Sequence, residues 1–139
     1  MLLLDNSAWA RLLQGRVPAP RAHEVGELVK KREIGVSLPF LLEAGYSARS
    51  GADRKQIMRR LARFPRVRVD AEVEHLALTA QRELAEVGHH RLAPSDLLIA
   101  SCAHCAEAGV LHYDADYDVV AQHTSLAFDS EWLAPAGTL

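Results

Sequence analysis

The sequence predicts an α/β fold, a three-layer α/β/α sandwich with a short, mainly parallel central sheet. Short apolar runs typical of strands alternate with longer segments whose apolar residues recur at helical spacing. Such alternation favours parallel strands joined by helical crossovers. The sequence has no internal repeat and no linker-like stretch, and 139 residues suffice to bury one hydrophobic core. We therefore expect a single domain spanning residues 1–139.

The first half of the chain begins with the apolar run "LLLD", which predicts a strand. Asn6 and Ser7 follow it and are good N-caps for a helix over "AWARLL". Pro18 and Pro20 break the chain before "RAHEVGELVKKRE", whose apolar residues have helical spacing. The next elements are a short β-branched strand at 33–37, a helix opened by Ser37 and Pro39, an amphipathic helix at 53–64 and an edge strand at 66–69.

The second half begins with a long helix that starts near Val73 and stops near Gly88, a residue type that commonly ends helices. Pro94 and Ser95 then open an apolar helix, and Gly109 separates this helix from the strand "VLHY". The run "LAF" predicts a final short strand, and "EWL" closes the fold.

The composition is that of an ordinary globular protein, with 49% hydrophobic residues, 24% charged residues and a net charge of −2. No window approaches the roughly 18 to 20 continuous apolar residues of a membrane span. The N-terminal apolar run reaches Asp5 at once and has no basic flank, which argues against a signal peptide. We expect a cytoplasmic protein with no membrane association.

The two cysteines, Cys102 and Cys105, lie within the apolar helix as "CAHC". A zinc site would need a second pair of ligands at a suitable spacing, although His104 and His112 are near in sequence. A redox pair would be expected at a helix start just after a strand. The residues around this pair are small and apolar, so we expect both cysteines to pack in the core.

Four acidic residues are predicted to meet at one edge of the sheet. Asp5 and Asp114 directly follow strands, Glu43 lies within two turns of a strand end, and Asp96 lies in the first turn of a helix. In open α/β sheets, ligands bind outside the carboxyl ends of the strands. Converging carboxylates cannot all stay ionised without cations, and oxygen ligands suit Mg²⁺ or Mn²⁺. This pattern indicates metal-assisted phosphodiester cleavage.

Each acid also has a structural interpretation. Asp5 and Asp96 could serve at helix N-termini, and Glu43 could lie on the wet face of its helix. Asp114, Asp116 and Asp118 could form a solvated loop or a calcium loop, but Val119 and Ser125 replace the Gly and Glu that a calcium loop requires at positions 6 and 12. The joint placement of the acids at strand ends favours the metal site.

A basic stretch runs from Arg49 to Arg68 and holds half of the basic residues against one acid, Asp53. Such a stretch can contact a nucleic-acid backbone, and Arg49, Arg54 and Lys55 lie closest in sequence to the helix of Glu43. The same residues could instead form a solvated face, or bind a protein partner or a second subunit.

The chain resembles the PIN-domain nucleases, in particular VapC-like toxins of toxin–antitoxin pairs. The resemblance spans nearly the whole chain and depends on "LLLDNSAW", "VSLPFLLEAGYSAR", "RLAPSDLLIASCA" and "LHYDADYDVVA". It implies a PIN-like fold with the acidic cluster of the family at Asp5, Glu43, Asp96 and Asp114. Asn6 stands where Thr, Ser or Ala is commoner, and Tyr117 stands where Phe is commoner.

The resemblance implies an endoribonuclease that depends on Mg²⁺, with Mn²⁺ as a substitute, and cleaves structured RNA through metal-activated water. It also implies a homodimer and a cognate antitoxin that inserts a segment into the active-site groove. Two alternatives remain open: a housekeeping PIN nuclease of RNA processing, and an inactive PIN-type scaffold that binds RNA or protein.

The resemblance and the residue chemistry together suggest a role for each side chain. Asp5, Asp96 and Asp114 are expected to hold the principal ion, with Asp116 as an additional ligand. Glu43 is expected to orient or deprotonate the attacking water, or to help hold a second ion. Ser7 is expected to hydrogen-bond a carboxylate ligand, and Asp118 to cap the helix that follows it.

Overall fold

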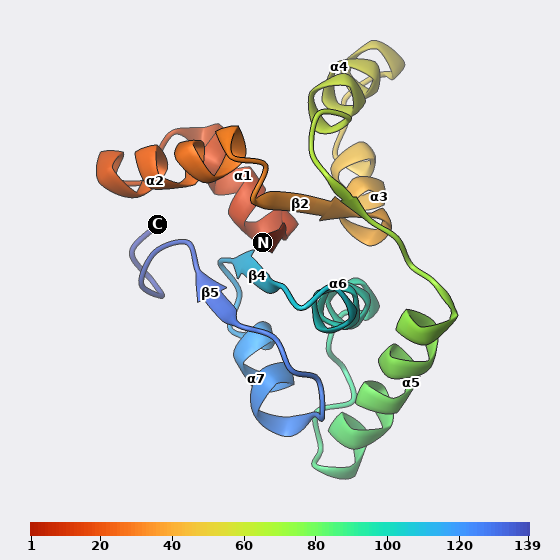
Figure 1. Cartoon of the computed structure of the whole chain (residues 1–139). Helices are drawn as coiled ribbons and strands as arrows, with labels where there is room; N and C mark the ends of the chain where they lie inside the picture. The colour runs from red at the N-terminus through yellow and green to blue at the C-terminus, as the bar shows by residue number, and fades with distance from the viewer.

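A parallel five-stranded sheet forms the centre of the computed structural model, which describes residues 1–139 (Figure 1). The strands are β1 Leu2–Leu4, β2 Ile34–Ser37, β3 Arg66–Val67, β4 Gly109–His112 and β5 Ser130–Trp132. Their order across the sheet is β3-β2-β1-β4-β5, and every neighbouring pair is parallel. The predicted fold class is confirmed, with a fully parallel sheet.

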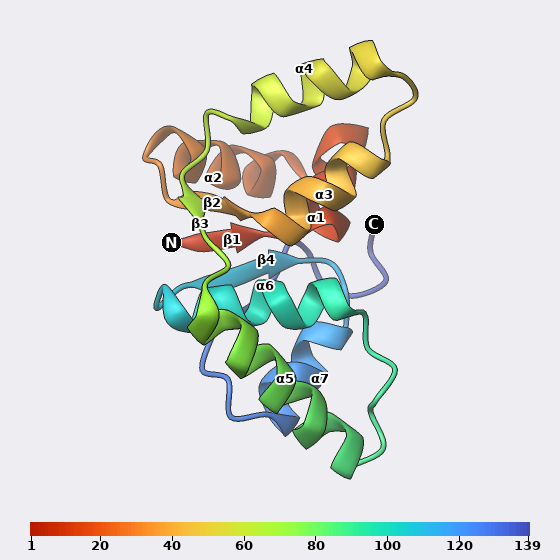
Figure 2. The ribbon, with the colours of Figure 1, turned by 90° about the vertical axis from the view of Figure 1, so that its right-hand side faces the viewer.

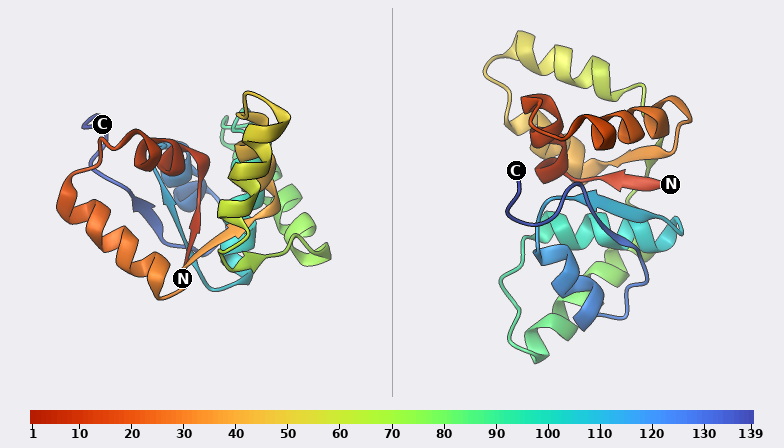
Figure 3. Two further views of the ribbon diagram at one scale, coloured as in Figure 1. Left: turned by 90° about the horizontal axis from the view of Figure 1, so that it is seen from above. Right: turned by 90° about the vertical axis from the view of Figure 1, so that its left-hand side faces the viewer.

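Seven helices connect the strands and cover both faces of the sheet. They are α1 Asn6–Gln14, α2 Ala19–Lys30, α3 Leu38–Tyr46, α4 Gly51–Leu61, α5 Ala71–Glu86, α6 Pro94–Cys105 and α7 Asp116–His123. Helices α1 and α2 lie on one face, while α6 and α7 lie on the other with α5 packed outside α6 (Figures 2 and 3). Helices α3 and α4 extend from the β2 side of the sheet. None of the helices has the length and the apolar run that crossing a bilayer requires.

The core lies along the two central strands, β1 and β4. Leu3, Leu4, Val110 and Leu111 are almost fully buried because helices cover the sheet on both sides. This double coverage explains why both strands appear in the sequence as continuous apolar runs rather than as alternating patterns. Cys102 is fully buried and Cys105 half-buried on α6, as expected for packing residues.

Gly109 is required where β4 passes its neighbours. A Cβ atom at this position would lie 2.8 Å from Leu2 Cδ2 and 2.9 Å from the carbonyl oxygen of Asp129. Because one of these atoms is backbone, it could not move away without disturbing the β4–β5 pairing. The glycine therefore lets β1, β4 and the segment before β5 approach closely.

The last strand differs from the prediction. The run at 126–128 is not a strand, and β5 begins at Ser130, which pairs with Val110. Leu126 is buried and Phe128 half-buried against the core, so the apolar character of this run reflects side-chain packing rather than strand pairing. Pro20 also does not break the chain but lies in the first turn of α2, where the missing N–H is tolerated.

Candidate metal centre

Asp5 lies directly after β1 and is 3% exposed. It caps α1 itself, which corrects the prediction that Asn6 and Ser7 would do so: its Oδ2 accepts the Ser7 N–H at 2.8 Å. The Ser7 hydroxyl donates to the same oxygen and accepts the Tyr113 N–H at 2.9 Å. Ser7 thus contacts a carboxylate, and it connects the end of β1 to the segment that follows β4.

Asp96 lies in the first turn of α6 and is 7% exposed. The helix begins at Pro94 after an N-cap at Ala93, and no side chain caps it. The Ser95 hydroxyl donates instead to Glu43 Oε1 on α3. A serine one position inside the helix presents its side chain to a neighbouring element, and here it holds the half-buried Glu43 at the beginning of α6.

Asp114 and Asp116 form the third side of the site, in the turn between β4 and α7. Asp114 Oδ1 accepts the Asp116 N–H at 3.0 Å, which fixes the turn. One ligand atom from each of Asp96, Asp114 and Asp116 lies within 4.8 Å of the other two. The structure therefore brings together three oxygen donors from two distant parts of the sequence.

The charges of the site act most strongly on Asp96. Burial, followed by the charges of Asp5, Asp114, Glu43 and Asp116, raises the pKa of Asp96 to about 7. Burial and the neighbouring Asp114 also raise the pKa of Asp116. All five acids are thus close enough to interact electrostatically, and their repulsion favours either protonation or a bound cation.

The donor set fits a hard divalent cation. Metal–oxygen bonds to Mg²⁺ are about 2.1 Å long, so ligands on opposite sides of the ion lie about 4.2 Å apart. The 4.8 Å limit for Asp96, Asp114 and Asp116 is compatible with sharing one ion after small side-chain adjustments. Asp5 and Asp96 both lie at helix N-termini, where the helix dipoles favour anions.

His112 and Asp118 support the turn that carries Asp114. His112 Nδ1 accepts the Asp114 N–H at 3.2 Å, so the ring proton is on Nε2, which donates to Ser130 Oγ at 2.8 Å. Ser130 Oγ and Trp132 Nε1 donate in turn to Asp118 at 2.6 and 2.8 Å. Asp118 is thus a connection to β5 and not the helix cap that was predicted.

Several polar contacts at the site are not predicted by the sequence pattern. Ser95 and Tyr117 are each adjacent in sequence to an acid of the cluster, but adjacency alone does not show which way a hydroxyl points. Arg11 lies four residues after Ser7 in the same helix, and this spacing would have predicted that the two residues lie on one face of it. Its Nη1 donates to the Ser7 carbonyl at 3.0 Å, and its guanidinium carbon lies 4.1 Å from the centre of the Tyr113 ring.

Ser37, at the end of β2, has a buried hydroxyl without a hydrogen-bond partner.

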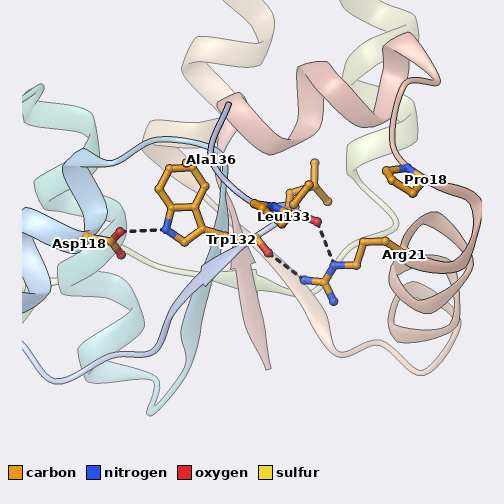
Figure 4. Close-up of a pocket in the computed structure, with 8 residues that line it drawn as sticks. Pro18, Arg21, Asp118, Trp132, Leu133 and Ala136 are labelled. Atoms are coloured by element: carbon orange, nitrogen blue, oxygen red, sulfur yellow. Dashed lines mark hydrogen bonds between the residues drawn. The ribbon is translucent and has the colours of Figure 1, made fainter. Parts of the chain in front are cut away.

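The cavity shown in Figure 4 is separate from the acidic cluster. It has a volume of about 600 Å³ and lies between the start of α2 and the C-terminal segment. Arg21 donates there to the carbonyls of Leu133 and Trp132 at 3.1 and 3.2 Å. None of the five acids lines this cavity, and its contacts fix the C-terminal segment to α2.

All eight residues of the basic stretch are exposed, and none of them forms an ion pair. Most lie on α4 or directly beside it. The beginning of α4 is on the side of the molecule toward which β1 and β4 point (Figure 2). Arg54 and Lys55 belong to the beginning of α4 and Arg49 precedes it in sequence, so this end of the basic stretch is on the side where β1 and β4 end, and the rest of α4 leads away from that side.

The fold and the cluster together define a class, α/β/α proteins with a carboxylate centre suited to divalent cations. The PIN domain family matches residues 2–122. Ribonuclease VapC18 of Mycobacterium tuberculosis is 36% identical over 139 residues, covering 98% of this chain and 97% of that protein. Ribonuclease VapC51 of the same organism is 35% identical, covering 99% and 96%. The chain therefore belongs to the PIN-domain family, which confirms the resemblance seen in the sequence.

Solved structures show the same fold. The VapBC2 complex of Rickettsia felis, bound to a DNA fragment from its promoter, contains a chain that matches with a TM-score of 0.74 at 18% identity and covers 94% of this chain and 98% of that one. A chain of VapBC-5 from Mycobacterium tuberculosis matches with a TM-score of 0.63 at 20% identity, covering 92% and 96%.

Proposed function

We propose that the chain is a Mg²⁺-dependent endoribonuclease, with Mn²⁺ as a substitute, and the toxin of a toxin–antitoxin pair. The observation that carries the proposal is the cluster of five acids, because oxygen ligands alone suit these ions. The relatives that match over nearly the full chain are named ribonucleases, which supports RNA as the substrate.

Each acid has a proposed role. Asp96, Asp114 and Asp116 hold the ion, since their ligand atoms lie within 4.8 Å of one another. Asp5 lies outside this group of three, but it shares the Tyr117 hydroxyl with Asp96 and is proposed as a fourth ligand, with Ser7 orienting its carboxylate. Glu43, held by the Ser95 hydroxyl, accepts a proton from the attacking water. A bound divalent ion supplies positive charge that stabilises the developing charge on the phosphate oxygens and lowers the pKa of water.

Removal of divalent ions is the test of this function. We expect the purified chain to cleave RNA in Mg²⁺ or Mn²⁺, to lose that activity in excess EDTA, and to regain it when Mg²⁺ is returned. The RNA should carry a label at one end and be blocked at both ends against digestion from the termini. Shorter labelled fragments on a gel would then show cleavage inside the chain. Cleavage that continues unchanged in EDTA would contradict a metal-dependent mechanism.

The RNA backbone is proposed to bind along the start of α4, through Arg49, Arg54 and Lys55. Exposed and unpaired cations on the same side as the acids support this surface. Replacing all three with Gln should weaken RNA binding and reduce the slope of log K against log salt by about 2, since each lost contact with a single strand removes about 0.7.

The matched control removes the same charge elsewhere, by replacing Lys30, Lys31 and Arg82 with Gln. Binding should be measured by fluorescence anisotropy in EDTA, where no cleavage is expected. If the slope of log K against log salt falls equally in both triple variants, the net charge of the protein sets the affinity for RNA, and this surface does not.

The proposed partners are an antitoxin and a second copy of the chain. Solved relatives with this fold are VapBC complexes, which supports an antitoxin. Two apolar hollows of about 300 and 270 Å³ share Leu98 and lie along α3, α5 and α6, and the exposed Leu78 and Leu42 line one each. This surface supports a homodimer.

The proposed place of action is the cytoplasm, where cellular RNA is accessible.

A further inference from the structure

Tyr117 has the largest fully buried side chain in the protein. It lies in the first turn of α7, the helix drawn below β5 in Figure 1. Its ring packs against His112 at a tilt of 32° with the ring centres 4.8 Å apart, and it meets Phe128 edge-on at 6.5 Å. These contacts need only an aromatic ring, so packing alone does not explain the hydroxyl. A buried hydroxyl is costly unless it has a hydrogen-bond partner.

The partners of this hydroxyl are two acids of the cluster. The Tyr117 oxygen lies 2.8 Å from Asp5 Oδ1 and 3.4 Å from Asp96 Oδ1. A phenol has one proton, and the shorter distance shows that it donates to Asp5. A phenol is protonated at neutral pH, so the hydroxyl acts as a donor here.

This contact completes the hydrogen bonding of Asp5. Its Oδ1 accepts from Tyr117, while its Oδ2 accepts from the N–H and the hydroxyl of Ser7. A carboxylate has about four lone-pair sites, so an orientation fixed on both oxygens still leaves a lone pair for a ligand. Hydrogen bonds thus fix the orientation of both Asp5 carboxylate oxygens and leave one lone pair free to bind a metal ion.

We propose that Tyr117 is a positioning residue, whose hydroxyl locks the Asp5 carboxylate beside Asp96 so that the site is assembled before a divalent ion binds. The inference rests on the proposed function and deepens it. A neutral donor suits this position, because a Lys or Arg there would neutralise the acids and compete with the ion. The phenol orients the Asp5 carboxylate and leaves the net charge of the site unchanged.

The test is the affinity of the chain for Mg²⁺ in a Tyr117→Phe variant, which keeps the ring and removes the hydroxyl. We expect titration calorimetry to show roughly tenfold weaker binding, as is typical when a group that orients a metal ligand is lost. RNA cleavage should need correspondingly more Mg²⁺ for half-maximal rate and should recover most of its rate at saturating Mg²⁺.

Tyr113→Phe is the matched control, because it also removes a phenol hydroxyl near the site. That hydroxyl contacts Leu139 and Pro135 and none of the acids, so Mg²⁺ affinity should be unchanged. Circular dichroism and urea unfolding should show that both variants keep the fold.

Equal Mg²⁺ affinity in wild type and Tyr117→Phe would overturn this inference alone. A loss of cleavage that saturating Mg²⁺ does not restore would also overturn it, since it would indicate a structural role. A wild-type chain that neither binds Mg²⁺ nor cleaves RNA would overturn the proposed function, and this inference with it.

Discussion

Replacing Asp5 with Asn is expected to lower the rate of metal-dependent RNA cleavage by about 10³-fold or more. The loss should exceed the 10- to 100-fold typical of groups that only orient a metal ligand, because Asp5 is itself a proposed ligand. The fold should persist, since Asn is as good an N-cap as Asp and can still accept the Ser7 N–H at the start of α1. Single-turnover cleavage at saturating Mg²⁺ would measure the effect on the chemical step.

Asp129→Asn is the matched control for this variant. Asp129 is an exposed acid beside the first residue of β4, at the opposite end of the strand from Asp114. The two substitutions are chemically identical, so only the position differs. If the two variants cleave RNA at similar rates while both remain folded, Asp5 is not part of the catalytic site.

The sequence was sufficient for the architecture because apolar runs and helical spacing report directly on burial. "LLL" and "GVLH" are continuous because helices cover the central strands on both faces. The run "LAF" misled for the same reason, since its side chains pack in the core but its backbone pairs with no strand. The true last strand, "SEW", is half-buried and contains two polar residues, so hydrophobicity alone did not predict it.

The acids of the site could be predicted because topology places them, whereas the hydroxyls could not. Asp5 and Asp114 follow parallel strands, and parallel strands end at one edge whatever the side-chain rotamers are. The contact of Ser95 with Glu43 depends instead on how α3 packs beside α6. The contact of Tyr117 with Asp5 depends on where α7 crosses the sheet. Such contacts follow from tertiary packing, which local sequence patterns do not encode.

The electrostatic strain of the cluster predicts that Asp96→Asn stabilises the metal-free protein. Because the folded-state pKa of Asp96 is raised to about 7, the folded protein retains a proton that the unfolded chain releases near pH 4. The contribution of Asp96 to the free energy of unfolding therefore falls as pH rises through this window. His112 acts in the opposite direction, because burial lowers its pKa and its contribution to stability increases with pH. The difference between variant and wild type separates the two effects.

That difference should be about 0.5 kcal/mol at pH 4.5 and should grow to about 2 kcal/mol at pH 8. Both figures are roughly half of the value that the full pKa shift gives, to allow for solvent screening and for coupling among the acids. Urea unfolding in EDTA at both pH values would measure it, with Asp129→Asn as the control that should show no pH-dependent gain. Saturating Mg²⁺ should reverse the order at pH 8, because the ion stabilises only a chain that binds it. An Asp96→Asn variant less stable than wild type in EDTA at pH 8 would show that the cluster does not repel itself in the folded state. If Asp96→Asn is instead more stable in EDTA and less stable in Mg²⁺, as expected, the same carboxylate destabilises the empty site and stabilises the filled one, which is how a cluster of acids can favour a bound ion.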